Sequence, residues 1–125
     1  MKDTMAHLHL VCQDWQRELA FYKGEIPFFR KRLEEIVSKN TAHEILTQAE
    51  HFENKFSIML GNYDELLHDV HLLDTSLLHD AAEKPAYIHV KMVETDDQLV
   101  ALMEDTAADF RATKNEFYRF LSKYL

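Results

Sequence analysis

Residues 45–77, ILTQAEHFENKFSIMLGNYDELLHDVHLLDTSL, decide the fold of this chain. Apolar side chains recur in this stretch at alternating steps of three and four residues. That spacing marks the a and d positions of a heptad repeat, which line one face of a long α-helix. The apolar line consists of Ile45, Ala49, Phe52, Phe56, Met59, Tyr63, Leu66, Val70, Leu73 and Leu77. The stretch therefore predicts one long helix that packs lengthwise against other helices.

The same repeat occurs on both sides of this stretch. The upstream line contains Met5, Leu8, Cys12, Trp15, Leu19, Tyr22, Ile26, Phe29, Leu33 and Ile36. The downstream line contains Val93, Val100, Met103, Ala107, Phe110, Phe117, Leu121 and Tyr124, with His89, Asp96 and Lys114 also at core positions. Asn40 suits a helix end, Thr41 to Glu44 has the form of a capping box, and Pro85 suits a first helical turn. These signals predict helices over about 4–39, 42–81 and 85–124.

Such short connections force neighbouring helices to run antiparallel. We therefore predict an all-α protein, an up-down-up antiparallel three-helix bundle with long coiled-coil-like helices, forming a single domain over residues 1–125. Gly24 and Pro27 interrupt the first helix chemically, but the apolar line keeps its phase across them, so we expect a continuous, bent helix. The alternative is a four-helix bundle created by a break near Gly24 or Gly61.

Composition excludes several classes of function. The chain has 125 residues, 46% of them hydrophobic, and no apolar run in it is long enough to span a membrane. Its first residues show no apolar run followed by a small-residue cleavage site, so we expect no secretory leader. The single cysteine, Cys12, excludes an intramolecular disulfide, and a net charge of −8 argues against nucleic-acid binding. Nucleophile elbows, phosphate loops and metalloprotease motifs are also absent. We expect a cytoplasmic, non-enzymatic protein with no catalytic residues, no cofactor and no small-molecule substrate.

The segment DELLHDVHLLDTSLLHD, residues 64–80, raises the question of a metal site. Glu65 and His68 have the spacing of a ligand pair, but the heptad phase turns them and His71 away from the core. No second Glu-x-x-His exists on another helix, so we assign no metal ligands. An alternative hypothesis is a weak surface metal-binding or metal- or pH-sensing module formed by His68, His71 and a nearby carboxylate. A solvated polar helix face is the simpler interpretation.

Antiparallel packing would also gather charge at one end of the bundle. The half that holds both the start of the first helix and the end of the second would contain fourteen acidic and four basic residues, a net charge of −10. The other half has eight acidic and ten basic residues, a net charge of +2. Six histidines fall in the acidic half, namely His7, His9, His68, His71, His79 and His89. Such asymmetry suits an interaction protein with a basic partner, although a chain of net charge −8 must place its acids somewhere.

Several large apolar residues fall at outward heptad positions. Phe21 and Phe28 lie one heptad apart beside Gly24 and Pro27. Aligned exposed phenylalanines are typical of an interface, whereas a wide packing face could absorb part of such a pair. We predict an interface with a protein partner or a second copy of the chain, formed by Phe21, Phe28, Ile58, Leu72 and Leu78.

The segments WQRELAFYKGEIPFFRKRLEEIVSKNT, residues 15–41, and AEHFENKFSIMLGNYDELLHDV, residues 49–70, resemble those of small bacterial helical proteins that carry no assigned activity. The shared features are apolar core positions and acidic residues. The resemblance implies the helical fold, and it implies no catalytic residue, cofactor or substrate.

Overall fold

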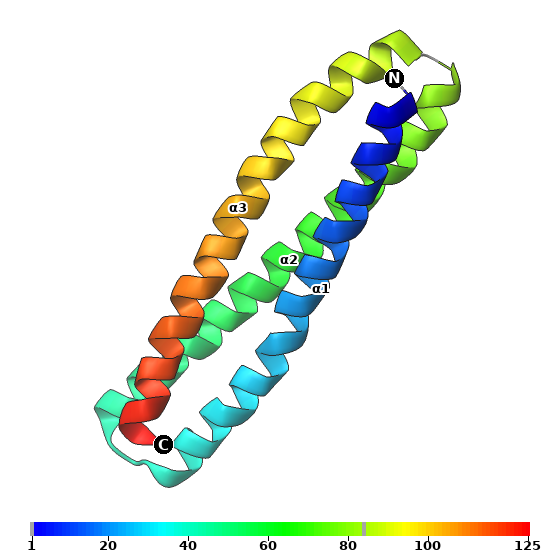
Figure 1. The fold of residues 1–125 in the computed structure, drawn as a ribbon. Coiled ribbons are helices and arrows are strands. Elements are labelled where there is room, and N and C mark those ends of the chain that lie inside the picture. The colour runs from blue at the N-terminus through cyan, green and yellow to red at the C-terminus, as the bar shows by residue number, and fades with distance from the viewer. Residues whose placement is uncertain (1, 84) are drawn as a thin grey trace.

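The computed structural model describes the backbone of residues 2–83 and 85–125, and the side chains of residues 6–75 and 97–125. Over this part of the chain the secondary structure consists of three long helices (Figure 1). They are α1 (Lys2–Lys39), α2 (His43–Glu83) and α3 (Pro85–Tyr124).

The helices run up, down and up, so the α1–α2 connection and the C-terminus share one end of an elongated bundle (Figure 1). The predicted all-α three-helix bundle is therefore confirmed, and its helix ends fall within two residues of those expected. α1 continues through Gly24 and Pro27, and α2 continues through Gly61. The four-helix alternative is not formed, because neither glycine adopts the positive φ that would turn the chain.

The connection between α1 and α2 is only three residues long. At its start, the Asn40 side-chain amide donates a 2.8 Å hydrogen bond to the carbonyl of Ile36 and satisfies the end of α1. At its end, the amides of Ile45 and Leu46 both donate to the carbonyl of Ala42 at 3.1 Å. Ala42 therefore occupies the cap position that the capping box assigned to Thr41. The predicted cap is wrong by one residue, because the backbone begins to coil after Ala42.

The core follows the predicted apolar lines on α1 and α2. Every predicted core residue of α1 from Leu8 to Ile36 is buried, and so is every one of α2 from Ala49 to Leu73. Ile45 is partly buried against the same core. Met5 and Leu77 lie outside the described side chains. A strict heptad line is sufficient to predict these two faces because α1 and α2 pack more closely against each other than either packs against α3.

The buried face of α3 differs from the prediction. Met103, Phe110 and Phe117 are buried as expected, whereas Val100 is 37% exposed and Lys114 and Leu121 are only partly buried. The residues buried in their place each lie one position earlier in the heptad, namely Leu99, Thr113 and Phe120. α3 is therefore rotated so that the flank facing α2 is buried and the flank facing α1 stays open. The predicted core positions Val93, His89 and Asp96 lie outside the described side chains.

Aromatic rings hold α3 in the bundle. Phe117 lies 5.4 Å from Phe29 of α1 and 5.1 Å from Phe56 of α2, measured between ring centroids. Phe110 stacks on Tyr22 at 4.4 Å. Large rings keep helix axes further apart than small aliphatic side chains do. α3 lies further from α1 and α2 than these two helices lie from each other, although rings also join α1 to α2 at Tyr22–Tyr63 and Phe29–Phe56.

Candidate functional site

Phe21 and Phe28 lie on the side of α1 that faces α3. The ring of Phe21 makes an edge contact with Phe110 of α3 at 6.2 Å between centroids. Phe21 is nevertheless 55% exposed, and Phe28, one heptad later, is 67% exposed. The bundle therefore leaves most of both rings in contact with solvent, and packing between α1 and α3 does not bury the pair.

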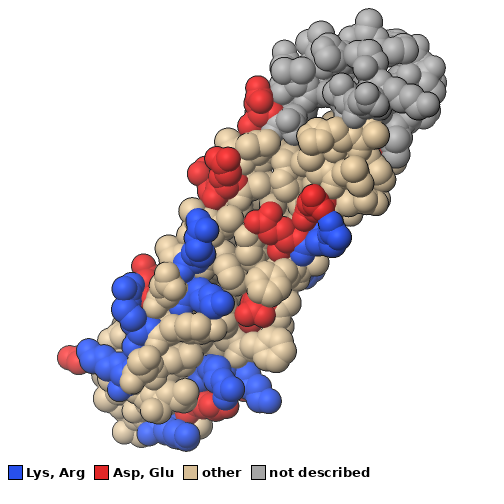
Figure 2. All heavy atoms as spheres, viewed as in Figure 1, with Lys and Arg blue, Asp and Glu red and all other residues tan. Residues whose placement is uncertain are grey.

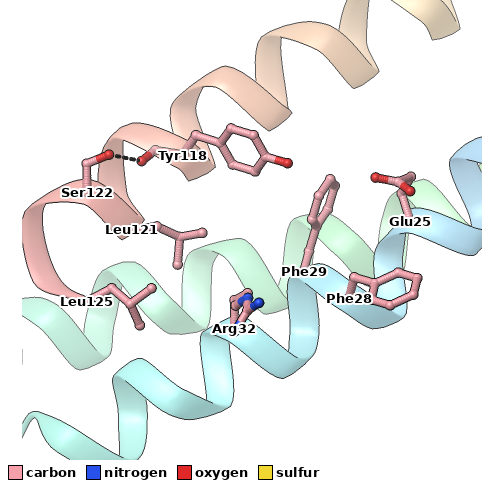
Figure 3. A pocket seen from close by; sticks show the side chains of 8 residues that line it. All are labelled: Glu25, Phe28, Phe29, Arg32, Tyr118, Leu121, Ser122 and Leu125. Carbon is pink, nitrogen blue, oxygen red and sulfur yellow. Dashed lines mark hydrogen bonds between the residues drawn. The ribbon is translucent and has the colours of Figure 1, made fainter.

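Next to Phe28, a groove of about 600 Å³ separates the second half of α1 from the end of α3 (Figure 3). Phe29 projects into it from α1, while Tyr118 and Leu121 project from α3. The remaining lining includes Leu125, which is 55% exposed, and Arg32. We call this surface, with Phe21 and Phe28 at its edge, the α1–α3 face.

The rotation of α3 creates this groove. Leu121 was expected at the centre of the bundle, but it lies at the bottom of an open groove because the α2 side of the helix is buried instead. Tyr118 is 45% exposed, and the Lys114 ammonium lies 5.4 Å from the centre of its ring. The large apolar surfaces of Tyr118 and Leu121 are thus only partly covered by the three helices.

Charge is divided along the α1–α3 face. On the view in Figure 2, basic side chains gather toward the end with the α1–α2 connection, and acidic side chains dominate the described part nearer the other end. On α3, Asp97 and Glu104 precede Arg111, Tyr118 and Leu125 at heptad intervals, so all five share one side of the helix. The sign of the charge therefore changes between Glu104 and Arg111.

The other residues of the predicted interface lie elsewhere. Ile58 is 60% exposed and Leu72 is 50% exposed. They lie two heptads apart on the outer side of α2, away from the α1–α3 face. Leu78 lies outside the described side chains. The structure therefore separates Phe21 and Phe28 from Ile58 and Leu72.

The histidines of the acidic half do not converge in the described region. His68 and His71 are both exposed on α2. His9 of α1 instead contacts Asp74 of α2, with 2.7 Å between Nδ1 and Oδ1, which places the start of α1 beside the end of α2 as predicted. Among the described side chains, no three His, Cys, Asp or Glu groups are arranged to hold a metal ion.

Two tyrosines lie in the middle of the core, 5.7 Å apart between ring centroids. The Tyr22 hydroxyl donates a hydrogen bond of 2.5 Å to Glu18. The Tyr63 hydroxyl is buried without a hydrogen-bond partner among the described residues. Burial raises the pKa of both phenols well above the usual value, and the Glu18 carboxylate raises the pKa of Tyr22 further. Both phenols therefore stay neutral, and neither lines the α1–α3 groove.

Tyr118, Leu121 and Leu125 belong to this surface but were absent from the predicted interface. Leu121 was assigned to the core, and Tyr118 and Leu125 lie at heptad positions outside the predicted line. A signal does exist, since Arg111, Tyr118 and Leu125 recur at heptad spacing beside the core line. Only the rotation of α3 shows which side of that line is left open.

Comparison with protein-family models, with curated proteins and with solved structures found no match to this chain. Within the described residues, none of the helices combines the length and the apolar character needed to cross a membrane. The α1–α3 face is therefore the candidate functional site of this protein.

Proposed function

We propose that this protein is a non-enzymatic, cytoplasmic interaction protein that pairs with a second copy of itself through the α1–α3 face. The observation that carries the proposal is the exposed row of Phe21 and Phe28 beside a groove lined by Tyr118, Leu121 and Leu125. Exposed aromatic residues beside an apolar groove are typical of a protein interface.

The distribution of charge favours a second copy as the occupant. Phe21 lies close to the middle of α1 (Lys2–Lys39), and the acidic and basic parts of the face lie on either side of it. A two-fold axis across the helices near Phe21 would set α1 against α1 and α3 against α3, antiparallel. The acidic half of each copy would then face the basic half of the other, with Glu104 of one copy close to Lys114 of the other. Complementary potential of this kind selects one orientation.

Light scattering coupled to size exclusion tests the pairing. We expect a mass about twice that of the 14.8 kDa chain for the wild type, and the mass of one chain for Phe21→Asp/Phe28→Asp, because two carboxylates would be buried without partners at the centre of the interface. The matched control is Leu10→Asp/Ile58→Asp, whose parent residues are exposed to a similar degree, at 58% and 60%. A monomeric wild type at high protein concentration would contradict the proposal, and so would equal dissociation of the control.

A charge exchange tests the antiparallel orientation. Glu104→Lys alone and Lys114→Glu alone should each weaken the dimer by placing like charges opposite each other, and the double variant should restore it. Sedimentation equilibrium at low ionic strength measures the three dimer constants. A double variant as weak as the sum of the single variants would exclude this orientation.

A further inference from the structure

We infer that a second groove, between the end of α1 and the start of α2, binds a basic amphipathic helix of another protein. The groove has a volume of about 730 Å³. Leu33 and Val37 of α1 and Leu46 and Ala49 of α2 form its apolar part. Leu33 and Ala49 are buried at its base, whereas Val37 is 46% exposed and Leu46 is 36% exposed, so these two side chains present the apolar part to solvent.

This groove lies on the opposite side of α1 from the α1–α3 face. Arg30, which lines it, contacts Glu53 of α2 at 2.9 Å between Nε and Oε1 and Ser57 of α2 at 2.8 Å. Phe28, by contrast, lines the groove toward α3. The two surfaces can therefore be occupied at the same time, and the present inference does not rest on self-association.

The charged residues at the rim of the groove indicate the sign of the partner's charge. Glu34, Glu50 and Glu53 border the groove, and Arg30 is the basic residue that lines it. Arg30 is paired with Glu53, whereas Glu34 and Glu50 form no ion pair with any described residue. Two carboxylates without an ion pair thus flank the apolar strip, and the charged residues that line the groove, one basic and three acidic, sum to −2. A partner that places lysine or arginine on both sides of an apolar row complements this arrangement.

The backbone of the groove defines the conformation of the partner. Both walls are α-helices, whose internal backbone amides and carbonyls are already paired within the helix. An extended peptide would find no strand edge there and would lose hydrogen bonds to water, whereas a helix satisfies its own backbone. From Arg30 to Ser38 the groove spans about two helical turns, roughly 12 Å at the usual rise. It therefore accommodates apolar anchors spaced i, i+4 and i+7.

Fluorescence anisotropy with a designed probe tests the inference. The probe is a labelled peptide of about four helical turns with leucine at i, i+3, i+4 and i+7 and lysine elsewhere. The protein carries Phe21→Asp/Phe28→Asp, so that binding is measured whether or not the wild type pairs. We expect Glu34→Gln/Glu50→Gln to weaken binding about tenfold, the effect of removing two complementary charges. The control Glu65→Gln/Glu116→Gln removes the same net charge from exposed positions elsewhere and should change binding less than about twofold.

A second pair of variants tests the apolar strip. Val37→Ser/Leu46→Ser should weaken binding about tenfold through lost apolar contact, whereas Leu10→Ser/Leu72→Ser, at comparably exposed positions, should not. All four side chains are partly solvent-exposed, and circular dichroism verifies that each variant stays helical. Equal losses in groove and control variants would show attraction by net charge alone and overturn the inference, as would a probe that does not bind. A loss of wild-type dimer mass in Glu34→Gln/Glu50→Gln would assign the groove to a second copy and also overturn it.

Discussion

α2 and α3 pack against α1 in two different ways. Between α1 and α2 the helices run close together, and charged side chains bridge the interface at His9–Asp74, Lys23–Asp64 and Arg30–Glu53. Rings also join α1 to α2, at Tyr22–Tyr63 and Phe29–Phe56. Between α1 and α3 the separation is larger, and ring contacts such as Tyr22–Phe110 and Phe29–Phe117 occur, in the described part of the chain, without such charged bridges. No ion pair joins α1 to α3 among the described side chains.

The difference explains where the molecule leaves surface free. Charged contacts at the edge of a close helix pair cover its apolar seam over much of its length, because long side chains extend across the gap. Rings fill a wider gap but leave its edge apolar, and this edge is the groove beside Tyr118. The charged contacts described between α1 and α2 lie at or before Arg30, and the acidic groove opens beyond it. Both proposed binding surfaces therefore follow from how α1 is packed.

The largest expected effect is on the ring packing of α3. Phe117 is fully buried and contacts Phe29, Phe52 and Phe56, so Phe117→Ala should lower the free energy of unfolding by about 3–5 kcal/mol. Lys55→Ala, which removes the ion pair to Asp109 at the α2–α3 interface, should cost less than about 1 kcal/mol. Urea denaturation followed by circular dichroism measures both. Similar losses in the two variants would contradict the view that rings hold α3.

An intermediate effect is expected from the two core tyrosines. Tyr22→Phe removes the hydrogen bond to Glu18 and should destabilise the fold by about 0.5–1.5 kcal/mol. Tyr63→Phe removes a buried hydroxyl without a described partner, so the fold should be unchanged or more stable by up to about 1 kcal/mol. The two variants make the same chemical change, and thermal and urea unfolding compare them directly. A loss in Tyr63→Phe as large as in Tyr22→Phe would reveal a hydrogen-bond partner for that hydroxyl.

The smallest effect is expected at the edge of the α1–α2 interface. Lys23 and Asp64 are 2.6 Å apart between Nζ and Oδ1, but both side chains are about half exposed. Lys23→Ala should therefore cost less than about 0.5 kcal/mol, and the difference should vanish in high salt. Denaturation of wild type and variant at two ionic strengths checks this. A larger cost that disappears in high salt would mean that charge, as well as apolar packing, holds α1 against α2, whereas a cost that persists in high salt would be assigned to lost packing of the Lys23 aliphatic chain.

The sequence predicted part of the α1–α3 face. Phe21 and Phe28 were identified because outward phenylalanines one heptad apart conflict with a solvated helix face. Their neighbours Tyr118 and Leu125 were missed, because on α3 apolar residues border Met103, Phe110 and Phe117 on both sides. Local spacing was therefore compatible with two rotations of α3 about its own axis, one that buries Leu121 and one that buries Phe120. Packing of Phe120 against Phe52 of α2, 5.2 Å apart between ring centroids, belongs to the rotation that the bundle adopts.

Heptad spacing and the scarcity of glycine and proline by themselves determined three long helices, their order and the buried faces of α1 and α2. These properties are local, because helical periodicity assigns each side chain to a face before any partner is present. The rotation of α3, the groove beside Tyr118 and the acidic groove beside Val37 were decided only by the tertiary structure. They depend on how large rings from three helices share one core, and that balance of contacts exists only when all three helices are packed together.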